Sequence, residues 1–501
     1  QHLPAQVPWP GPGLASTLCL EPNMLQEAFL YFRILVLLGG INLAPALLGY
    51  LHRHAQSRPL DQGRRLGDSQ PIFGPGKTVW GLCSALLAGP LLALILFWPW
   101  WLGLACAMLS MLGDLGSSFA KRRLHLPRGT DLPVLDHLPE SALPLIPLAA
   151  YLQLGLLQCL LLLAIFCLAG WQWTKLYKQV LLQKPFAWYP RPLSPRVRLK
   201  ELASCRESSS FWGTVLHFEE AIYYHLLLQG FFRVTGLYPR GMANALCFQV
   251  QELSISLPDL PRAFDGYSIL FLCDLHLDGL PGLTERLLGV LDKLRPDLCL
   301  LGGDYRMRTH GTYQEALGHL RRLLQKIHAP DGTLAVLGNH DCLEMVDTLY
   351  SQGARVLIND SCRIERSGQH IWIAGVDDPH YYKCHDTARA FQEIPADGFC
   401  LFLAHSPVLY QEAQSLGASL YLAGHTHAGQ IQLPPWGPVF THCPAPRSFC
   451  TGFWTYQGLL GYTSPGVGVS GVPVRFNCSG EVTMLTLHQG PKQYNSQGYT
   501  S

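Results

Sequence analysis

The first 170 residues are dominated by long runs of apolar side chains. Three runs, at residues 29–51, 81–112 and 146–170, each exceed the roughly 20 residues that a helix needs to cross a bilayer. In the middle run Pro99 lies among tryptophans, so a tight helical hairpin is an alternative, although the run is short for two crossings. We therefore predict a transmembrane region at residues 29–170 with about three spans.

Basic residues lie on both sides of this region. Residues 52–80 carry five Lys and Arg residues, and residues 171–200 carry seven with no acid among them. By the positive-inside rule both stretches are cytoplasmic, which a three-span topology satisfies. We expect a multi-pass protein of the inner or plasma membrane whose second half faces the cytoplasm.

The stretch at 171–240 is predicted to be a basic linker followed by an interfacial helix. Its apolar part, residues 211–236, carries Glu219 and Glu220 at the centre, where a spanning helix would bury them at high cost. A metal site formed by Glu219, Glu220 and His225 is the alternative to a solvated face.

From about residue 241 the pattern changes to short apolar runs separated by helical patterns. Runs such as ILFLCD, LCLLGGD and LYLAGH predict buried strands, and LTERLLGVLDKL and QEALGHLRRLLQKI predict helices between them. Residues 458–487 alternate without helices and predict added antiparallel strands. We expect a domain at residues 241–490, a polar tail at 491–501 and a separate N-terminal segment at 1–28.

Composition narrows the class of protein. Of 501 residues, 48% are hydrophobic and only 14% are charged, which is too apolar for an ordinary soluble enzyme. The net charge of +2 favours no nucleic-acid partner, and no protein partner is implied. The sixteen cysteines are scattered without CxxC spacing, which predicts reduced thiols in a reducing compartment. The Pro-rich first 28 residues lack the pattern of a signal peptide.

Polar residues follow five of the predicted strands. Each position taken singly is typical of a turn, a helix cap or a structural histidine. Together, at the carboxyl ends of strands, they indicate one shared site. Carboxylates and imidazoles without a Ser or Cys nucleophile suit two divalent cations close together. The residues are Asp274, His276, Asp304, Asn339, His340, Asp341, His405, His425 and His427.

These motifs resemble those of the calcineurin-like metallophosphoesterases. The ordered elements are DLH at 274–276, GGD at 302–304, GNHD at 338–341, His405 and GHTH at 424–427. The lead-in and closing stretches of residues 241–488 look like the membrane-anchored bacterial branch. The resemblance implies an α+β fold, a four-layer α/β/β/α sandwich, behind the N-terminal transmembrane helices.

The resemblance also implies roles for the site residues. Asp274, His276 and His427 would hold one divalent cation, and Asn339, His405 and His425 the other. Asp304 would bridge them, and His340 would be the catalytic acid. The two ions would be manganese, iron or zinc, since these ligands accept all three.

Two neighbouring stretches depart from the family pattern or extend it. Many relatives carry a carboxylate where this chain has Met307, so Asp341 is one candidate to orient His340, whose partner the sequence leaves open. Arg306, Arg308 and His310 are candidates to grip a second substrate phosphate, the alternative being a solvated turn.

Two loops are candidates to contact substrate. Residues 375–386, with Asp377, Asp378, His380 and His385, are either a substrate-contacting loop or an acid-capped turn. The aromatic, Pro-rich insertion at 434–454 is either an apolar lid for a lipid substrate or a plain loop.

The sequence therefore predicts a membrane-anchored, binuclear-metal phosphoesterase, a phosphoric ester hydrolase. It would cleave a phosphodiester, pyrophosphate or phosphomonoester bond, and a lipid-linked phosphate ester is the substrate that anchoring favours. The alternative is a catalytically silent scaffold or binding module at the membrane, which predicts missing ligands. A transporter would need more charged spans than Arg33 and Asn42 provide.

Overall fold

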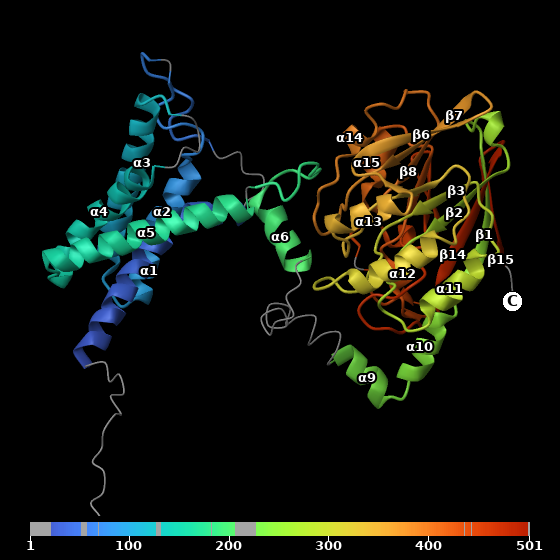
Figure 1. The fold of residues 1–501 in the computed structure, drawn as a ribbon, viewed down its shortest axis with the longest axis horizontal. Coiled ribbons are helices and arrows are strands. Elements are labelled where there is room, and N and C mark those ends of the chain that lie inside the picture. Colours follow the sequence, from blue (N-terminus) through green and yellow to red (C-terminus); the bar gives the residue numbers. More distant parts are fainter. Residues whose placement is uncertain are drawn as a thin grey trace, which may run out of the picture. The chain divides into compact units, whose positions relative to one another are not determined.

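The chain divides into two compact units, Gln1–Gln183 and Lys184–Ser501, each of which is described by itself (Figure 1). The computed structural model describes residues 22–51, 58–68, 70–126, 132–181, 183–205, 227–434, 436–441 and 443–498.

The first unit is helical, and its apolar surface is that of a membrane protein. Ile34, Leu102 and Leu148 form part of a small buried core, whereas Leu87 and Leu157 are exposed. Three segments are long and apolar enough to span a bilayer: Gln26–Leu48, Trp100–Arg123 and Leu156–Leu181. The helices are α1 (Pro22–Leu51), α2 (Val79–Ile95), α3 (Trp100–Arg123), α4 (Pro133–Leu152) and α5 (Leu156–Leu181).

Two of the predicted spans differ from the helices observed. The run at 81–112 is a hairpin of α2 and α3, because Pro99 disfavours a helical conformation at the residue before it and begins a new helix. The run at 146–170 is interrupted between α4 and α5, where Gln153 has left-handed backbone angles as the C-cap of α4. The hairpin at Pro99 is the alternative that the sequence left open, and among the described residues three segments are long and apolar enough to span a bilayer, the number predicted.

At the start of the second unit, the described residues before β1 form three helices. They are α6 (Pro195–Cys205), α9 (Gln229–Val234) and α10 (Tyr238–Leu246). Glu219, Glu220 and His225, the alternative metal site, lie outside the described residues.

The second unit contains two large sheets and a small hairpin. One sheet has the strand order β15-β1-β14-β2-β3-β4-β5, and the other has the order β12-β13-β9-β8-β7-β6. Strands β2 to β5 run parallel, as do β7, β8, β9 and β13. The strands of the first sheet are β1 (Gln249–Leu257), β2 (Tyr267–Leu272), β3 (Leu298–Leu301), β4 (Thr333–Ala335), β5 (Ala354–Val356), β14 (Glu481–Gln489) and β15 (Gln493–Gly498). Those of the second are β6 (Asp360–Arg366), β7 (Gln369–Gly375), β8 (Cys400–Leu403), β9 (Leu420–Ala423), β12 (Gly452–Tyr456) and β13 (Leu459–Thr463), and β10 (Gln432–Leu433) pairs with β11 (Gly437–Pro438).

The two sheets pack face to face, with helices outside. Phe271 and Leu300 of the first sheet share one buried cluster with Leu401 of the second. On the outer face of the first sheet, Leu270 packs with Leu287 and other helix residues. This arrangement confirms the predicted four-layer sandwich. The helices are α11 (Leu283–Leu291), α12 (Gln314–Leu324), α13 (Val346–Ser351), α14 (Thr387–Ala390) and α15 (Tyr410–Ser415).

Candidate metal centre

The predicted site residues lie just beyond the carboxyl ends of strands from both sheets. Asp274 follows β2, Asp304 follows β3, and His425 follows β9. All three have left-handed backbone angles, with φ of 50°, 57° and 73°. This conformation costs free energy for a residue with a side chain, so the surrounding structure must impose it. The sharp turns bring side chains from distant strands together.

One group of side chains comprises Asp274, His276 and His427. The Nε2 atoms of His276 and His427 lie 3.1 Å apart. His427 Nε2 lies 3.6 Å from Asp274 Oδ1. All three residues are buried, and their ligand atoms lie within 4.8 Å of one another.

A second group comprises Asn339, His405 and His425. His405 Nε2 lies 3.0 Å from Asn339 Oδ1 and 3.2 Å from His425 Nδ1. The candidate ligand atoms are one amide oxygen and two imidazole nitrogens.

Asp304 lies between the two groups. Its Oδ2 atom is 3.7 Å from His276 Nε2 in the first group and 3.3 Å from His405 Nε2 in the second. Its other oxygen, Oδ1, accepts the backbone N–H of His340 at 2.9 Å. One carboxylate oxygen therefore faces both groups while the other fixes the position of the carboxylate.

Backbone carbonyls orient two of the imidazoles. His276 Nδ1 lies 2.8 Å from the oxygen of Arg306, and His405 Nδ1 lies 2.9 Å from the oxygen of Gly302. A carbonyl can only accept, so each Nδ1 carries a proton and each ring turns its Nε2 towards the site.

The titratable groups of the site influence one another's protonation. Burial, followed by the nearby His340, lowers the pKa of His276 to about 3, so this ring is neutral at pH 7. Burial alone would raise the pKa of Asp304, but the adjacent His405 and His340 hold it well below its usual range. Burial lowers the pKa of His405, but the Asp304 carboxylate outweighs this and raises it well above its ordinary value, so His405 has to release a proton when it binds a metal ion.

The expected orienting partner of His340 differs from the one observed. His340 Nδ1 lies 2.6 Å from the main-chain oxygen of Met307. The Asp341 carboxylate instead accepts the backbone N–H groups of Asp304, Tyr305 and Gly338, at 2.7 to 2.9 Å. The expectation that Asp341 orients His340 is therefore wrong: Asp341 organises the two turns, and a carbonyl replaces the missing carboxylate.

The three candidates for a second phosphate site are placed differently from one another. Arg306 is fully buried, and each of its guanidinium nitrogens donates to a backbone oxygen, among them those of His340 and Ser204. This contradicts the expectation that Arg306 grips a substrate phosphate. Arg308 is exposed, and His310 is half-buried with Nδ1 3.1 Å from Thr309 Oγ1.

The loop at 375–386 borders the site, but its acids serve the loop itself. The Asp378 carboxylate accepts the backbone N–H groups of His380, Tyr381 and Tyr382, so the substrate contact expected of Asp378 is contradicted. This turn holds the His380 ring 4.2 Å from that of His425. His385 lies apart from the site and faces Glu412 at 3.9 Å.

A buried ion network joins the segment before α6 to this loop. The Arg191 guanidinium donates to both oxygens of Asp377, at 2.7 and 2.9 Å, and to Glu201 at 3.2 Å. Sequence reasoning used Arg191 only as a topology signal and missed this role. No pattern of residues around Arg191 or Asp377 indicated that these two side chains would pair.

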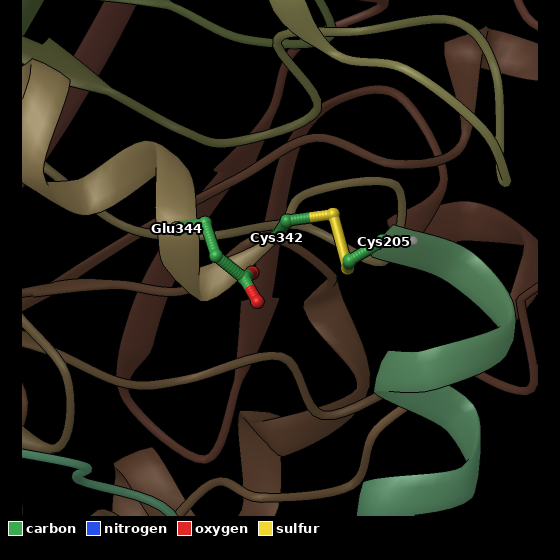
Figure 2. Close-up of side chains that lie close together, drawn as sticks. All are labelled: Cys205, Cys342 and Glu344. Atoms are coloured by element: carbon green, nitrogen blue, oxygen red, sulfur yellow. A yellow bond between two sulfur atoms is a disulfide. The ribbon is translucent and has the colours of Figure 1, made fainter. Parts of the chain in front are cut away.

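Two cysteines are oxidised, contrary to the expectation of reduced thiols alone. Cys205, the last residue of α6, forms a disulfide with Cys342 (Figure 2). Cys342 is two residues beyond His340, so the bond fastens α6 to the turn that carries the predicted catalytic acid. A spacing of 137 residues carries no local signal by which the sequence could reveal the pair.

Arg475 is a further residue that the sequence did not single out. It is fully buried and donates to the backbone oxygens of Pro465, Gly466 and Gly468. One of its nitrogens lies 3.5 Å from His427 Nδ1. It therefore holds the closing glycine-rich loop against the first ligand group.

The donor set fits two divalent cations. Overlapping groups of His and Asp ligand atoms lie within 4.8 Å of one another, and Asp304 belongs with residues of both groups. Mixed nitrogen and oxygen ligands of this kind bind manganese, iron and zinc.

Comparisons with known proteins agree with the geometry of the second unit. Residues 267–429 match the family model of the calcineurin-like phosphoesterases. Phosphodiesterase YaeI of Escherichia coli is 32% identical over 232 residues, 44% of this chain and 82% of that protein. The transmembrane protein with metallophosphoesterase domain of Danio rerio is 28% identical over 259 residues, 48% of this chain and 57% of that protein.

The first unit matches a different family. Residues 52–170 match the CarS-like model, described as CDP-archaeol synthase. The CDP-archaeol synthase of Hyperthermus butylicus is 39% identical over 103 residues, 19% of this chain and 58% of that protein. This match and the one to the Danio rerio protein each span less than two thirds of the relative's length.

Proposed function

This chain belongs to the calcineurin-like phosphoesterase family, and we propose that it cleaves a lipid-linked pyrophosphate or phosphodiester with two divalent cations. It is a metal-dependent phosphoester hydrolase in a membrane protein. The placement of Asp304 carries the two-ion proposal. One oxygen of this carboxylate faces His276 and His405, which belong to separate ligand groups. A carboxylate shared in this way can bridge two ions.

The proposed ligands are those that the motifs predicted. Asp274, His276 and His427 would hold one ion, Asn339, His405 and His425 the other, and Asp304 both. When bound, the ions would neutralise phosphate oxygens and lower the pKa of a water molecule so that it can attack phosphorus. A catalytically silent scaffold would be expected to lack ligands, whereas all seven are present here.

His340 would supply the proton that the leaving group needs. Its Nδ1 is engaged by the carbonyl of Met307, and its Nε2 lies 3.7 Å from Asp304 Oδ2, on the side of the metal centre. A protonated ring fixed in this orientation can donate from Nε2 to the departing oxygen.

The substrate class rests on the first unit. Its likeness to a CDP-archaeol synthase and its apolar helices both point to lipid chemistry. A CDP-linked lipid contains a pyrophosphate between nucleoside and lipid, and two cations can bind the oxygens on both of its phosphorus atoms. We therefore favour a nucleoside-diphosphate lipid or a similar lipid pyrophosphate as substrate.

Turnover by the purified full chain tests this function. We expect hydrolysis of bis-p-nitrophenyl phosphate that depends on added manganese, and faster hydrolysis of a CDP-linked lipid in detergent micelles than of free CDP. No turnover of any phosphate ester with manganese, iron or zinc would contradict the hydrolase. Equal rates on the lipid and on free CDP would contradict the lipid substrate.

A second candidate function belongs to the first unit, which we propose transfers a cytidylyl group from CTP to a lipid phosphate with release of pyrophosphate. Lys77 pairs with Asp114 at 2.5 Å, and His137 pairs with Glu140 at 2.8 Å. Helices α3 and α4 approach closely here, since a Cβ on Gly113 would lie 2.3 Å from the oxygen of Pro139. Ionisable side chains in an apolar helical unit are costly, which favours a functional role.

Label transfer tests this second function. Because the proposed hydrolase would cleave a CDP-linked lipid, the assay uses the full chain with Asp304→Asn. Incubating it with α-labelled CTP and a lipid phosphate should give a labelled lipid, and adding Asp114→Asn should abolish it. Because Asp114 lies in the first unit, Asp114→Asn alone should keep hydrolysis of bis-p-nitrophenyl phosphate. No labelled lipid from the Asp304→Asn chain would contradict the transferase.

A further inference from the structure

Helix α9 and the helical residues just before it expose a stripe of apolar side chains on one face. Leu227, which precedes α9, and Phe231 and Val234 within it are 59%, 56% and 90% exposed, and a helical spacing of four and three residues places them on the same side. The opposite face is buried: the Phe232 ring stacks on Phe476 with centroids 5.3 Å apart. The exposed stripe is therefore not needed for packing within the described part of the second unit.

The β10–β11 hairpin also exposes apolar side chains. Leu433 is 50% exposed and Trp436 is 78% exposed. The hairpin and α9 share one buried cluster, in which Phe232 packs against Val472 and Val474, with Ile431 and Phe476 beside them. Ile431 also forms a β-bridge with Phe476. The two exposed groups are thus carried by one packed unit.

This surface is joined to the candidate metal centre by the chain itself. Ile431 follows the turn of His427, Ala428 and Gly429 after an intervening Gln430. The hairpin packs on that turn, because a Cβ on Gly429 would lie 2.2 Å from Pro438 Cβ. Gln430 bonds to Ser470 and Val472 of the closing loop. The hairpin therefore packs directly on the turn that carries His427.

The charges around the surface favour anionic lipid. There is no Asp or Glu at residues 221–251 or 413–480. Arg233 and Arg240 are exposed beside the stripe. An apolar surface with a large aromatic residue and flanking cations is the composition that binds the headgroup region of a bilayer.

The chain also joins the second unit to a candidate membrane span by a short connection. The last candidate span, Leu156–Leu181, ends only three residues before the second unit begins at Lys184. A tether of this length raises the effective concentration of the membrane at the second unit, so weak contacts suffice for binding.

We infer that the stripe of α9 and the β10–β11 hairpin together form a lipid-contacting surface, defined by Leu227, Phe231, Val234, Leu433 and Trp436, that seats the rim of the metal centre in the headgroup region. The contact with lipid is inferred from this surface alone. The role of the surface in admitting a lipid-linked phosphate to the site rests on the proposed function.

Photocrosslinking of the full chain in nanodiscs of phosphatidylcholine and phosphatidylglycerol tests the contact without any need for activity. A benzophenone amino acid replaces Trp436, Phe231 or, as the control, Tyr350, which is 53% exposed on α13. We expect lipid adducts at positions 231 and 436 and none at 350. Adducts to a second copy of the chain, absence of lipid adducts at 436, or equal lipid adducts at 350 would overturn the inference.

Kinetics then test the use of the surface. The double variant Leu433→Ser with Trp436→Ser should raise KM for a vesicle-borne lipid pyrophosphate about tenfold, because two apolar contacts with lipid are lost. Hydrolysis of bis-p-nitrophenyl phosphate should be unchanged, which also shows that the variant folds. An unchanged KM for the vesicle-borne substrate would overturn this use, whereas loss of all turnover in the unaltered chain would speak only against the proposed function.

Discussion

His340 Nδ1 lies 2.6 Å from the main-chain oxygen of Met307, so the backbone and not a side chain orients the proposed catalytic acid. The loop that carries Met307 is itself held by the buried Arg306, which bonds to the oxygen of His340. The two turns therefore fix each other, and the Met307 side chain is not required for the orientation.

Substitutions at these two positions should have very different effects. His340→Asn should lower kcat by about 10²- to 10⁴-fold, the usual contribution of general acid catalysis. Met307→Leu should leave kcat within about threefold, because the carbonyl remains. Steady-state rates on bis-p-nitrophenyl phosphate measure both. A large loss in Met307→Leu would show that the side chain has a role that the carbonyl contact does not explain.

Asp304→Asn should weaken metal binding and lower kcat together. Replacing the shared carboxylate by an amide removes a negative charge that faces both ligand groups, so we expect a loss of about a thousandfold, equivalent to several kcal/mol of transition-state stabilisation. Elemental analysis should find fewer than two ions per chain. Two tightly bound ions in this variant would exclude Asp304 as the bridge. Chelation of the unaltered chain should abolish turnover, and manganese should restore it.

Arg191→Ala should destabilise the second unit by about 3–5 kcal/mol, because it leaves the carboxylate of Asp377 buried without its partner. The matched control is Arg355→Ala, which breaks the exposed pair with Asp360 and should cost less than about 1 kcal/mol. Urea unfolding of the full chain, followed by fluorescence, compares the two. Equal free energies of unfolding for the two variants would show that the buried network makes no net contribution to stability.

The disulfide should stabilise the second unit through the length of the loop that it closes. For a spacing of 137 residues the loss of chain entropy corresponds to about 4–5 kcal/mol. Cys205→Ser with Cys342→Ser should therefore unfold at lower urea, and dithiothreitol should have no further effect on it. Peptide mapping without reductant detects the bond itself. A free Cys205 thiol in protein isolated with alkylation would restore the expectation of a reducing compartment.

Asp297 should make stability depend on pH in the acid range. Burial raises its pKa, but the N–H of Ser268 and the guanidinium of Arg366 outweigh this and hold it below the ordinary value. A carboxyl group whose pKa is lower in the folded state stabilises the fold at pH values above its unfolded-state pKa of about 3.9. This contribution is lost as the pH falls through the folded-state pKa. Asp297→Asn should flatten the stability profile below about pH 4. A profile identical to that of the unaltered chain would contradict this.

The sequence by itself determined the class of fold and indicated the membrane region and the candidate ligands. Buried parallel strands are continuous apolar runs, and polar residues at their carboxyl ends follow within a few residues, so both signals are local. Asp274, Asp304 and His425 could be singled out for this reason. Apolar runs of spanning length are local signals too, and Pro99 indicated the hairpin alternative, but the break at Gln153 was not located.

Only the tertiary structure decided the partners. The carbonyl of Met307, the carboxylate of Asp377 and the sulfur of Cys342 meet His340, Arg191 and Cys205 across 33 to 186 residues. Such pairs depend on how separate elements pack, and no pattern of neighbouring residues records that packing. For the same reason Arg306 looked like a phosphate ligand in the sequence and proved to be a buried brace in the fold.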